Sequence, residues 1–242
     1  MILNPETLTR FNNAANGQPL YAPNEATNAI IEPKTIVEFV APAAEGKSAL
    51  IREVDLLHSE FSVVTGFTTR PEEARDTGGR YTYFNTDEEL NTLLGRIEKG
   101  SVVQYVQHPT TGQFYGSFPE DYHTKFNMLD VLSNTVNDLD RLAFKSIFKI
   151  AVVSHGEEWI NRFLERYPDG SEERTKRVTE AIQSLEWVQN QPKNSLSWLH
   201  NRDGYIRGAA HIAISIVKTD RATPDLTHLA AEMYDEAMKV AV

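Results

Sequence analysis

Short apolar runs alternate along the chain with segments whose apolar residues recur at helical spacing. The runs rich in β-branched residues predict buried strands at 35–40, 61–64, 101–107, 126–132 and 146–153. Apolar residues three and four positions apart predict helices at 48–59, 87–99, 157–167, 171–189 and 224–240. Strands that alternate with helices in this way favour an α/β fold with a doubly wound, mainly parallel sheet.

The two ends of the chain show different patterns. Residues 1–33 are rich in Asn, Pro, Ala and Thr and have little periodicity, which predicts an irregular N-terminal extension. In the last predicted helix, Thr223 is expected to be the N-cap and Pro224 to occupy the first turn. No internal repeat and no Pro/Ser-rich linker divides residues 34–242, so we expect one further domain there.

Composition narrows the classes of function. A chain of 242 residues with 40% apolar content can bury a substantial core, and its net charge of −10 disfavours a surface built for nucleic acid. The absence of cysteine excludes disulfides, thiolate metal sites and cysteine nucleophiles. No apolar run approaches the ~20 residues of a membrane helix. We therefore expect a cytoplasmic protein with no membrane and no nucleic-acid partner, as a monomer or homodimer.

The segment APAAEGKS, residues 41–48, ends like a phosphate-binding loop of the form G-x-x-x-x-G-K-[ST]. In such a loop, backbone N–H groups and a helix N-terminus surround phosphates, the lysine neutralises charge and the hydroxyl binds Mg²⁺. Ala41 and Ala44 stand where glycines are usual, and their β-carbons restrict the backbone. Alone, GKS is consistent with an accidental turn, but the predicted strand before it and helix after it favour a nucleotide site.

Further segments follow in an order that resembles the guanylate kinase family over residues 35–205. They are TTRP (68–71), RYTYFNTDEEL (80–90), VVQYVQHPTTGQFYGSF (102–118), NMLDV (127–131), SIFKIAVVSHGEEWINRFLERY (146–167), GSEERTKRVTEAI (170–182) and NRD (201–203). Each segment is a weak signal by itself, whereas their order and spacing together are specific.

The resemblance implies a P-loop NTPase-type sheet flanked by helices, with a small β-rich monophosphate-binding lobe and a helical lid. The core would comprise residues 34–65 and 124–242, with the lid at about 162–180 and the lobe at 66–123. It also implies a nucleoside monophosphate kinase that uses Mg²⁺ and ATP and accepts GMP or a related (deoxy)nucleoside monophosphate.

Site residues carried over from the family fall into four sets. The ATP-binding set is Ala44, Glu45, Gly46, Lys47, Ser48 and Ala49, and Mg²⁺ would be held, largely through water, by Ser48 and Asp130. The monophosphate set is Gly66, Arg70, Arg75, Tyr81, Gln104, Tyr115 and Ser117. The catalytic set is Lys47, Arg70, Asp130, Arg174 and Arg177, with Arg162 and Arg166 as further phosphate donors. These residue types suit phosphoryl transfer, which needs gathered cations, in-line positioning and a lid that excludes water.

Three positions depart from the family pattern. Gln104 replaces a glutamate that accepts two hydrogen bonds from guanine, so one acceptor and one donor stand there instead. Gly66 replaces a base-contacting serine, and Glu73 falls where a second arginine is usual, which Arg75 replaces only if the loop is rearranged. The sequence therefore specifies the class of reaction better than it specifies the base of the acceptor nucleotide.

Competing interpretations remain at this stage. A catalytically weak or inactive module of the same fold could hold a nucleotide or a phosphorylated peptide, and the alanines of the loop favour it. Another interpretation is a kinase that phosphorylates a modified nucleotide, whose base would be recognised by Gln104. The segment SEERTKR could be a solvated helix start with Glu173 and Arg177 as an i, i+4 pair, and residues 108–113 could be a simple solvated turn.

Overall fold

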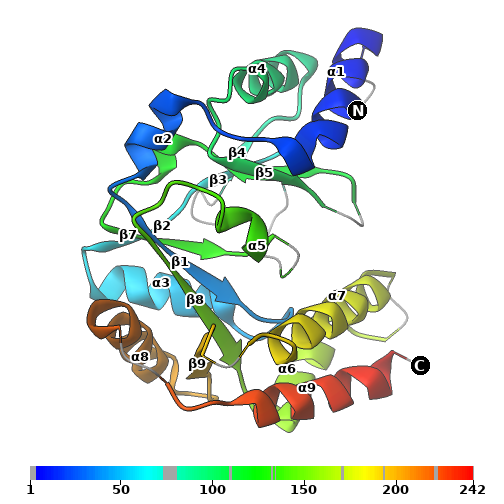
Figure 1. Cartoon of the computed structure of the whole chain (residues 1–242). Coiled ribbons are helices and arrows are strands. Elements are labelled where there is room, and N and C mark those ends of the chain that lie inside the picture. The colour runs from blue at the N-terminus through cyan, green and yellow to red at the C-terminus, as the bar shows by residue number, and fades with distance from the viewer. Residues whose placement is uncertain are drawn as a thin grey trace. The chain divides into compact units, whose positions relative to one another are not determined.

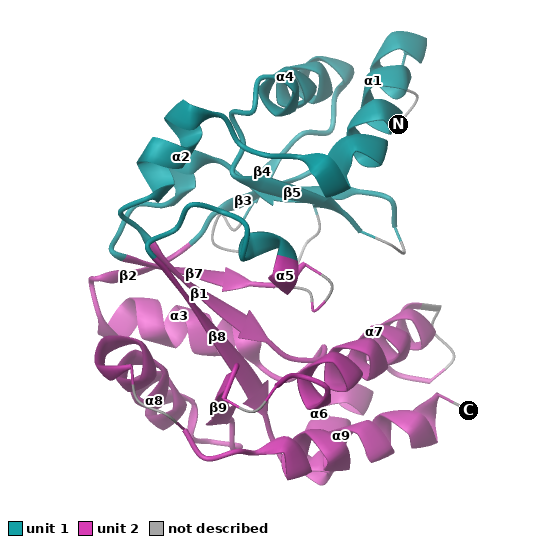
Figure 2. Cartoon of the chain, viewed as in Figure 1, with its two compact units in different colours: residues 1–34, 64–125, 138–145 teal, residues 35–63, 126–137, 146–242 magenta. Residues whose placement is uncertain are grey.

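The chain folds into two compact units, each built around its own sheet (Figure 2). The computed structural model describes residues 4–72, 81–108, 111–131, 133, 135–169, 172–192, 194–220 and 223–241. The lobe unit comprises Met1–Lys34, Val64–Lys125 and Asp138–Lys145, and the core unit comprises Thr35–Val63, Phe126–Asn137 and Ser146–Val242. The short helix α5 (Val136–Leu139) contributes residues to both units.

The core unit contains a five-stranded parallel sheet in the order β2-β7-β1-β8-β9. Its strands are β1 (Thr35–Val40), β2 (Phe61–Val63), β7 (Phe126–Asp130), β8 (Ser146–Val153) and β9 (Ser197–His200). The central strand β1 is buried along its whole length, as expected for a strand covered by helices on both faces. The predicted doubly wound α/β fold is confirmed.

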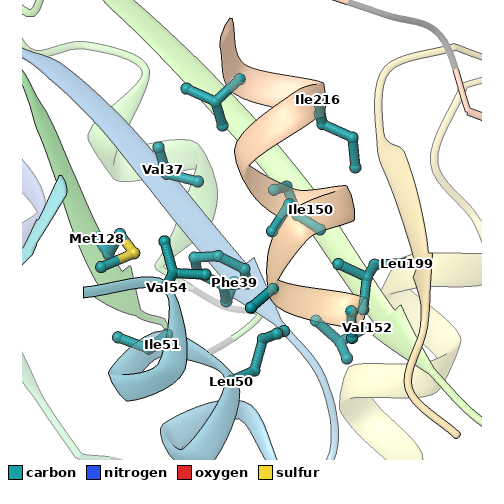
Figure 3. Close-up of a cluster of buried hydrophobic side chains, with 14 of the residues drawn as sticks. Val37, Phe39, Leu50, Ile51, Val54, Met128, Ile150, Val152, Leu199 and Ile216 are labelled. Atoms are coloured by element: carbon teal, nitrogen blue, oxygen red, sulfur yellow. The ribbon is translucent and has the colours of Figure 1, made fainter. Parts of the chain in front are cut away.

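Helices cover both faces of this sheet (Figure 1). On one face, α3 (Lys47–Leu57) and α8 (Ile206–Thr219) pack against the strands, and Figure 3 shows Leu50, Val54 and Ile216 among the side chains of this core. On the other face lie α6 (Gly156–Arg166), α7 (Glu172–Gln189) and α9 (Thr227–Val240). None of the helices within the described residues has the length and apolar content needed to span a membrane.

The lobe unit contains a four-stranded mixed sheet in the order β4-β3-β6-β5. Its strands are β3 (Gly66–Thr68), β4 (Tyr81–Tyr83), β5 (Gln104–Gln107) and β6 (Phe114–Ser117). Strands β3 and β4 are parallel, whereas β6 pairs antiparallel with β3 and β5. One face of the sheet packs against helix α4 (Asp87–Glu98), which begins with a capping box of Thr86 and Glu89. The short 3-10 helices η1 (Gln18–Leu20) and η2 (Pro119–Asp121) complete the unit.

The prediction of an irregular N-terminal extension is wrong. The segment forms helices α1 (Pro5–Gly17) and α2 (Glu25–Ile31). Their N-caps are Asn4 and Asn24, whose side chains accept hydrogen bonds from the backbone N–H groups three residues later. The asparagines that resemble loop residues in the sequence therefore begin the helices instead. Helix α1 packs on the apolar cluster of the lobe unit through Phe11, Ala14 and Ala15, and so few apolar residues give only a weak periodic signal.

Two smaller differences concern the end of the chain. The predicted ranges include neither α8 nor β9, and α9 begins at Thr227, three residues after the predicted start. Thr223 does not cap α9, because its hydroxyl accepts a hydrogen bond from the backbone N–H of Trp198 at 2.6 Å. The residue with the sequence signature of a cap thus joins the segment before α9 to strand β9.

Candidate functional site

The loop between β1 and α3 has the backbone shape of an anion-binding turn. Gly46 has a φ of 87°, and its carbonyl accepts hydrogen bonds from the N–H groups of Ala49 and Leu50, at 3.0 Å each. A β-carbon at Gly46 would lie 2.8 Å from Asn201 Nδ2, so both conformation and space require glycine. Ala44 adopts a φ of 65° without that freedom. The loop places the N-terminal N–H groups of α3 where a phosphate can bind.

Lys47, Ser48 and Asp130 meet at the start of α3. The Lys47 ammonium donates to the Ala41 carbonyl at 2.8 Å and lies 2.9 Å from Asp130 Oδ1. Ser48 Oγ donates to Asp130 Oδ2 at 3.4 Å. Strands β1 and β7 are neighbours in the sheet, which brings the loop after β1 next to the end of β7. The hydroxyl and the carboxylate are the hard oxygen ligands that Mg²⁺ prefers, so this pair fits the metal.

Four side chains from outside the loop donate hydrogen bonds to it. Trp159 Nε1 donates to the Ala43 carbonyl at 2.9 Å, and Asn201 Nδ2 donates to the Glu45 carbonyl at 2.6 Å. The Glu45 side chain is fully buried and accepts hydrogen bonds from Ser154 Oγ at 2.8 Å and Arg162 at 2.9 Å. Burial raises the pKa of Glu45 to about 8, although Arg162 and Ser154 act in the opposite direction.

The two arginines of α6 make contacts within the core unit. Arg162 binds Glu45 and Ser154 and, through its other terminal nitrogen, Asp203 at 2.6 Å. Arg166 lies over the ring of Tyr167, 5.4 Å from its centroid.

The two arginines of the predicted lid make ion pairs near their own positions. Arg174 pairs with Asp169. Arg177 pairs with Glu173 at 3.6 Å and with Glu180 at 2.8 Å. The contact with Glu173 is the i, i+4 pair of the solvated-helix interpretation, so the role of both arginines in a lid stays a prediction.

In the lobe unit, strand pairing brings the predicted monophosphate residues onto one sheet. Gly66 is the register partner of Tyr81, and Thr68 is the register partner of Tyr115. The rings of Tyr81 and Tyr115 meet edge to face at a centroid distance of 5.9 Å. The Arg70 guanidinium lies 5.4 Å from the centroid of the Tyr81 ring, so an arginine and two tyrosines lie close together on this sheet.

Strands β5 and β6 of this sheet carry the two predicted base-contacting residues. Gln104 is the register partner of Ser117, so their side chains share one face of the antiparallel pair. Ser117 Oγ is hydrogen-bonded to the Tyr122 hydroxyl at 2.8 Å. At Gly66, a β-carbon would lie 2.8 Å from the Gly116 carbonyl oxygen. A serine at position 66 would therefore require a backbone shift.

Comparison with known proteins agrees with these motifs. Over 91 residues, the chain is 26% identical to the guanylate kinase of Thermosynechococcus vestitus, a match that covers 38% of this chain and 45% of that protein. The chain is therefore similar in sequence to a guanylate kinase. It spans less than half the length of that curated relative. The solved guanylate kinase of Anaplasma phagocytophilum is 11% identical, with a TM-score of 0.49 over 78% of this chain and 86% of that one. No family model matches the chain.

Several residues of the candidate site were not assigned roles by sequence reasoning. Tyr83 lies beside Arg70, with 5.8 Å between the guanidinium and the ring centroid, and the ring of His108 lies 5.9 Å from that of Tyr115. Tyr83 follows Tyr81 at the two-residue spacing of one strand face, a signal that could have identified it. Trp159 gives no such signal, because a buried tryptophan and a loop-anchoring one look alike in sequence. Arg75, which the sequence predicts to bind the monophosphate, lies outside the described residues.

Proposed function

We propose that this protein is a nucleoside monophosphate kinase that transfers the γ-phosphoryl group of ATP to GMP or a related (deoxy)nucleoside monophosphate. The observation that carries the proposal is the meeting of Lys47, Ser48 and Asp130 at the N-terminus of α3. A cation, a hydroxyl and a carboxylate in that arrangement supply what a phosphate loop needs for charge and metal.

In the core unit, the N–H groups from Gly46 to Ala49 would bind ATP phosphates. Lys47, which now bridges Ala41 and Asp130, would move its ammonium to the transferring phosphoryl group. Ser48 and Asp130 would hold Mg²⁺ directly or through water, and the bound metal would neutralise charge on the β- and γ-phosphates.

In the lobe unit, Arg70, Tyr81 and Tyr115 would hold the phosphate of the acceptor nucleotide. A guanidinium grips phosphate through two parallel hydrogen bonds, and tyrosine hydroxyls add further donors. The lobe sheet supports this use because its other face is filled by the apolar cluster around Phe67 and Phe114, which fixes the strands.

The base would be read at Gln104 and Ser117. The Gln104 amide offers one acceptor beside one donor, whereas the adjacent N1–H and amino group of guanine are both donors. One of those guanine donors would face the amide nitrogen and stay unsatisfied, which lowers the discrimination in favour of guanine over other bases. Bases that present a donor beside an acceptor match the amide better. We therefore expect a preference for guanine that is weaker than in a kinase with a carboxylate at this position.

A panel assay tests the proposal. ADP formation from Mg-ATP is measured with each ribo- and deoxyribonucleoside monophosphate as acceptor, in the wild type and in the Lys47→Ala and Arg70→Ala variants. We expect turnover with at least one acceptor, a loss of at least about 100-fold in kcat for Lys47→Ala and a raised acceptor KM for Arg70→Ala. Inactivity of the wild type with every acceptor would refute the kinase proposal.

The left-handed conformation of Ala44 favours one competing function, a binding module that has kept the fold without catalysis. A non-glycine residue in that conformation strains the loop that ATP would need. Calorimetry separates the two functions: a kinase binds Mg-ATP with saturable heat, whereas a module that holds only a phosphorylated peptide does not.

A further inference from the structure

Glu45 is an unusual residue for the middle of a phosphate loop, because its acidic side chain stands next to the proposed phosphate site. Its side chain does not reach solvent. It points away from solvent to Ser154 and Arg162, which both donate to the same oxygen, Oε2. Ser154 Oγ and Arg162 are themselves 2.7 Å apart, so the three groups form a closed triangle of hydrogen bonds.

This triangle connects the loop to two elements of the core unit. Ser154 directly follows β8, and Arg162 lies in the middle of α6. Arg162 is also bound to Asp203, in the segment between β9 and α8. A buried polar group is costly unless it is hydrogen-bonded, so the hydrogen bonds from Arg162 and Ser154 are required for the loop to keep this conformation.

The loop needs such support because its backbone is strained. Ala44 and Gly46, on either side of Glu45, both have positive φ angles, of 65° and 87°. A left-handed conformation costs about 1–2 kcal/mol for a residue with a β-carbon, and it persists only where neighbouring contacts determine it. Glu45 is the residue between these two positions, and both its carbonyl and its carboxylate are tied to the core unit.

We propose that Glu45 is a positioning residue, which holds the Ala44–Gly46 turn in its anion-binding shape through its hydrogen bonds with Arg162 and Ser154. Arg162 then serves as the partner of Glu45 and not as a phosphate ligand. The expected effects on nucleotide binding rest on the proposed kinase function, whereas the expected effect on the conformation of the loop does not depend on it.

The test compares two substitutions that differ in one property. Glu45→Gln keeps a carbonyl oxygen that can accept from Arg162 and Ser154, whereas Glu45→Leu has a similar size and no acceptor. Val54→Ala is the matched control, because Val54 is a fully buried residue of α3 in the apolar core and lowers stability by loss of packing alone.

Two readouts are measured on the full chain of each variant. Amide hydrogen exchange reports the loop and the first turn of α3, and calorimetry gives the affinity for Mg-ATP and for the acceptor nucleotide. For Glu45→Leu we expect at least about tenfold faster loop exchange and at least tenfold weaker Mg-ATP binding, with unchanged acceptor affinity. Glu45→Gln should stay within about threefold of wild type in both loop exchange and Mg-ATP affinity. Val54→Ala should change these two readouts no more than its lower overall stability accounts for.

Two results would overturn the proposal: wild-type exchange in Glu45→Leu, or equal effects of Glu45→Gln and Glu45→Leu. A wild-type protein that does not bind Mg-ATP would refute the proposed function, but the exchange measurement would still decide whether Glu45 positions the loop.

Discussion

Among individual residues, Ala44 offers the most direct test of strain in the phosphate loop. Its φ of 65° is easily adopted by glycine. Ala44→Gly should therefore raise the free energy of unfolding by about 0.5–1 kcal/mol, the relieved strain less the added chain entropy. Urea unfolding measures the change. Ala43→Gly is the control, since Ala43 has no positive φ: it should lower stability by about 0.5–1 kcal/mol. Equal changes in the free energy of unfolding for the two substitutions would show that the backbone at Ala44 is not strained.

Glu45 should make stability depend on pH. Burial raises the pKa of Glu45 from 4.5 to about 8; Arg162 and Ser154 oppose this rise, and Glu158 on α6 adds to it. Between those values the folded protein holds a proton that the unfolded chain has lost, so the free energy of unfolding falls as pH rises. Glu45→Gln should remove up to about 1.4 kcal/mol per pH unit of this slope. Chemical denaturation at several pH values measures it, and identical slopes in both proteins would exclude the effect.

The sequence predicts charged site residues better than it predicts their supports. Lys47, Ser48 and Asp130 belong to motifs whose spacing is fixed by the chemistry of phosphate and Mg²⁺, and the structure brings them together. Trp159 and Asn201 hold the loop by donating to carbonyl groups more than 100 positions away in the chain. Such contacts depend on tertiary packing, for which a single sequence carries no periodic signal.

Among the elements, α1 shows why composition alone misjudged the N-terminal segment. Polar residues cover its solvent side, and its packing relies on a few contacts. The Phe11 ring stacks on Phe114 at a centroid distance of 4.1 Å, and the Ala14 carbonyl accepts a hydrogen bond from the Tyr105 hydroxyl. Arg10 pairs with Glu98 of α4. One aromatic and a few polar contacts fix a helix whose apolar periodicity is too sparse to predict.

Phe11 should therefore determine whether α1 stays docked. Phe11→Ala should lower the free energy of unfolding of the lobe unit by about 2–3 kcal/mol, somewhat less than for a fully buried phenylalanine. Hydrogen exchange in α1 should accelerate as well. Leu8→Ala, at a largely exposed position of the same helix, is the control and should change stability by less than about 0.5 kcal/mol. An equal response of both variants would show that the stacking contact does not hold α1.

For the molecule as a whole, the alternation of strands and helices predicts the fold class but not the strand order. Strand β1 lies between β7 and β8, although β2 follows β1 in sequence. The lobe unit is formed from three separate stretches of chain, including the N-terminal segment. Neither feature follows from local periodicity, because both depend on which long-range pairings bury the most apolar surface. The order of the sequence motifs, by contrast, indicated the similarity to guanylate kinases that the comparison with a curated relative also finds.

A ligand that carries both nucleotides should test whether the two units act on one reaction. An adenosine and a second nucleoside joined by five phosphates would present a nucleotide to the core unit and another to the lobe unit. Because the second binding event becomes intramolecular, such an analogue should bind at least about tenfold more tightly than ATP or the monophosphate alone. The net charge of −10 repels this polyanion, so local cations must hold each of its two nucleotides.

Two variants identify the source of that gain in a calorimetric titration. Lys47→Ala should weaken the linked analogue and ATP and leave the monophosphate unchanged, whereas Arg70→Ala should weaken the linked analogue and the monophosphate and leave ATP unchanged. Either substitution alone should bring the affinity of the analogue close to that of the nucleotide still bound. An analogue that binds wild type no better than ATP would show that the lobe unit does not hold the second nucleotide while the core unit holds the first, and the kinase proposal would then fail.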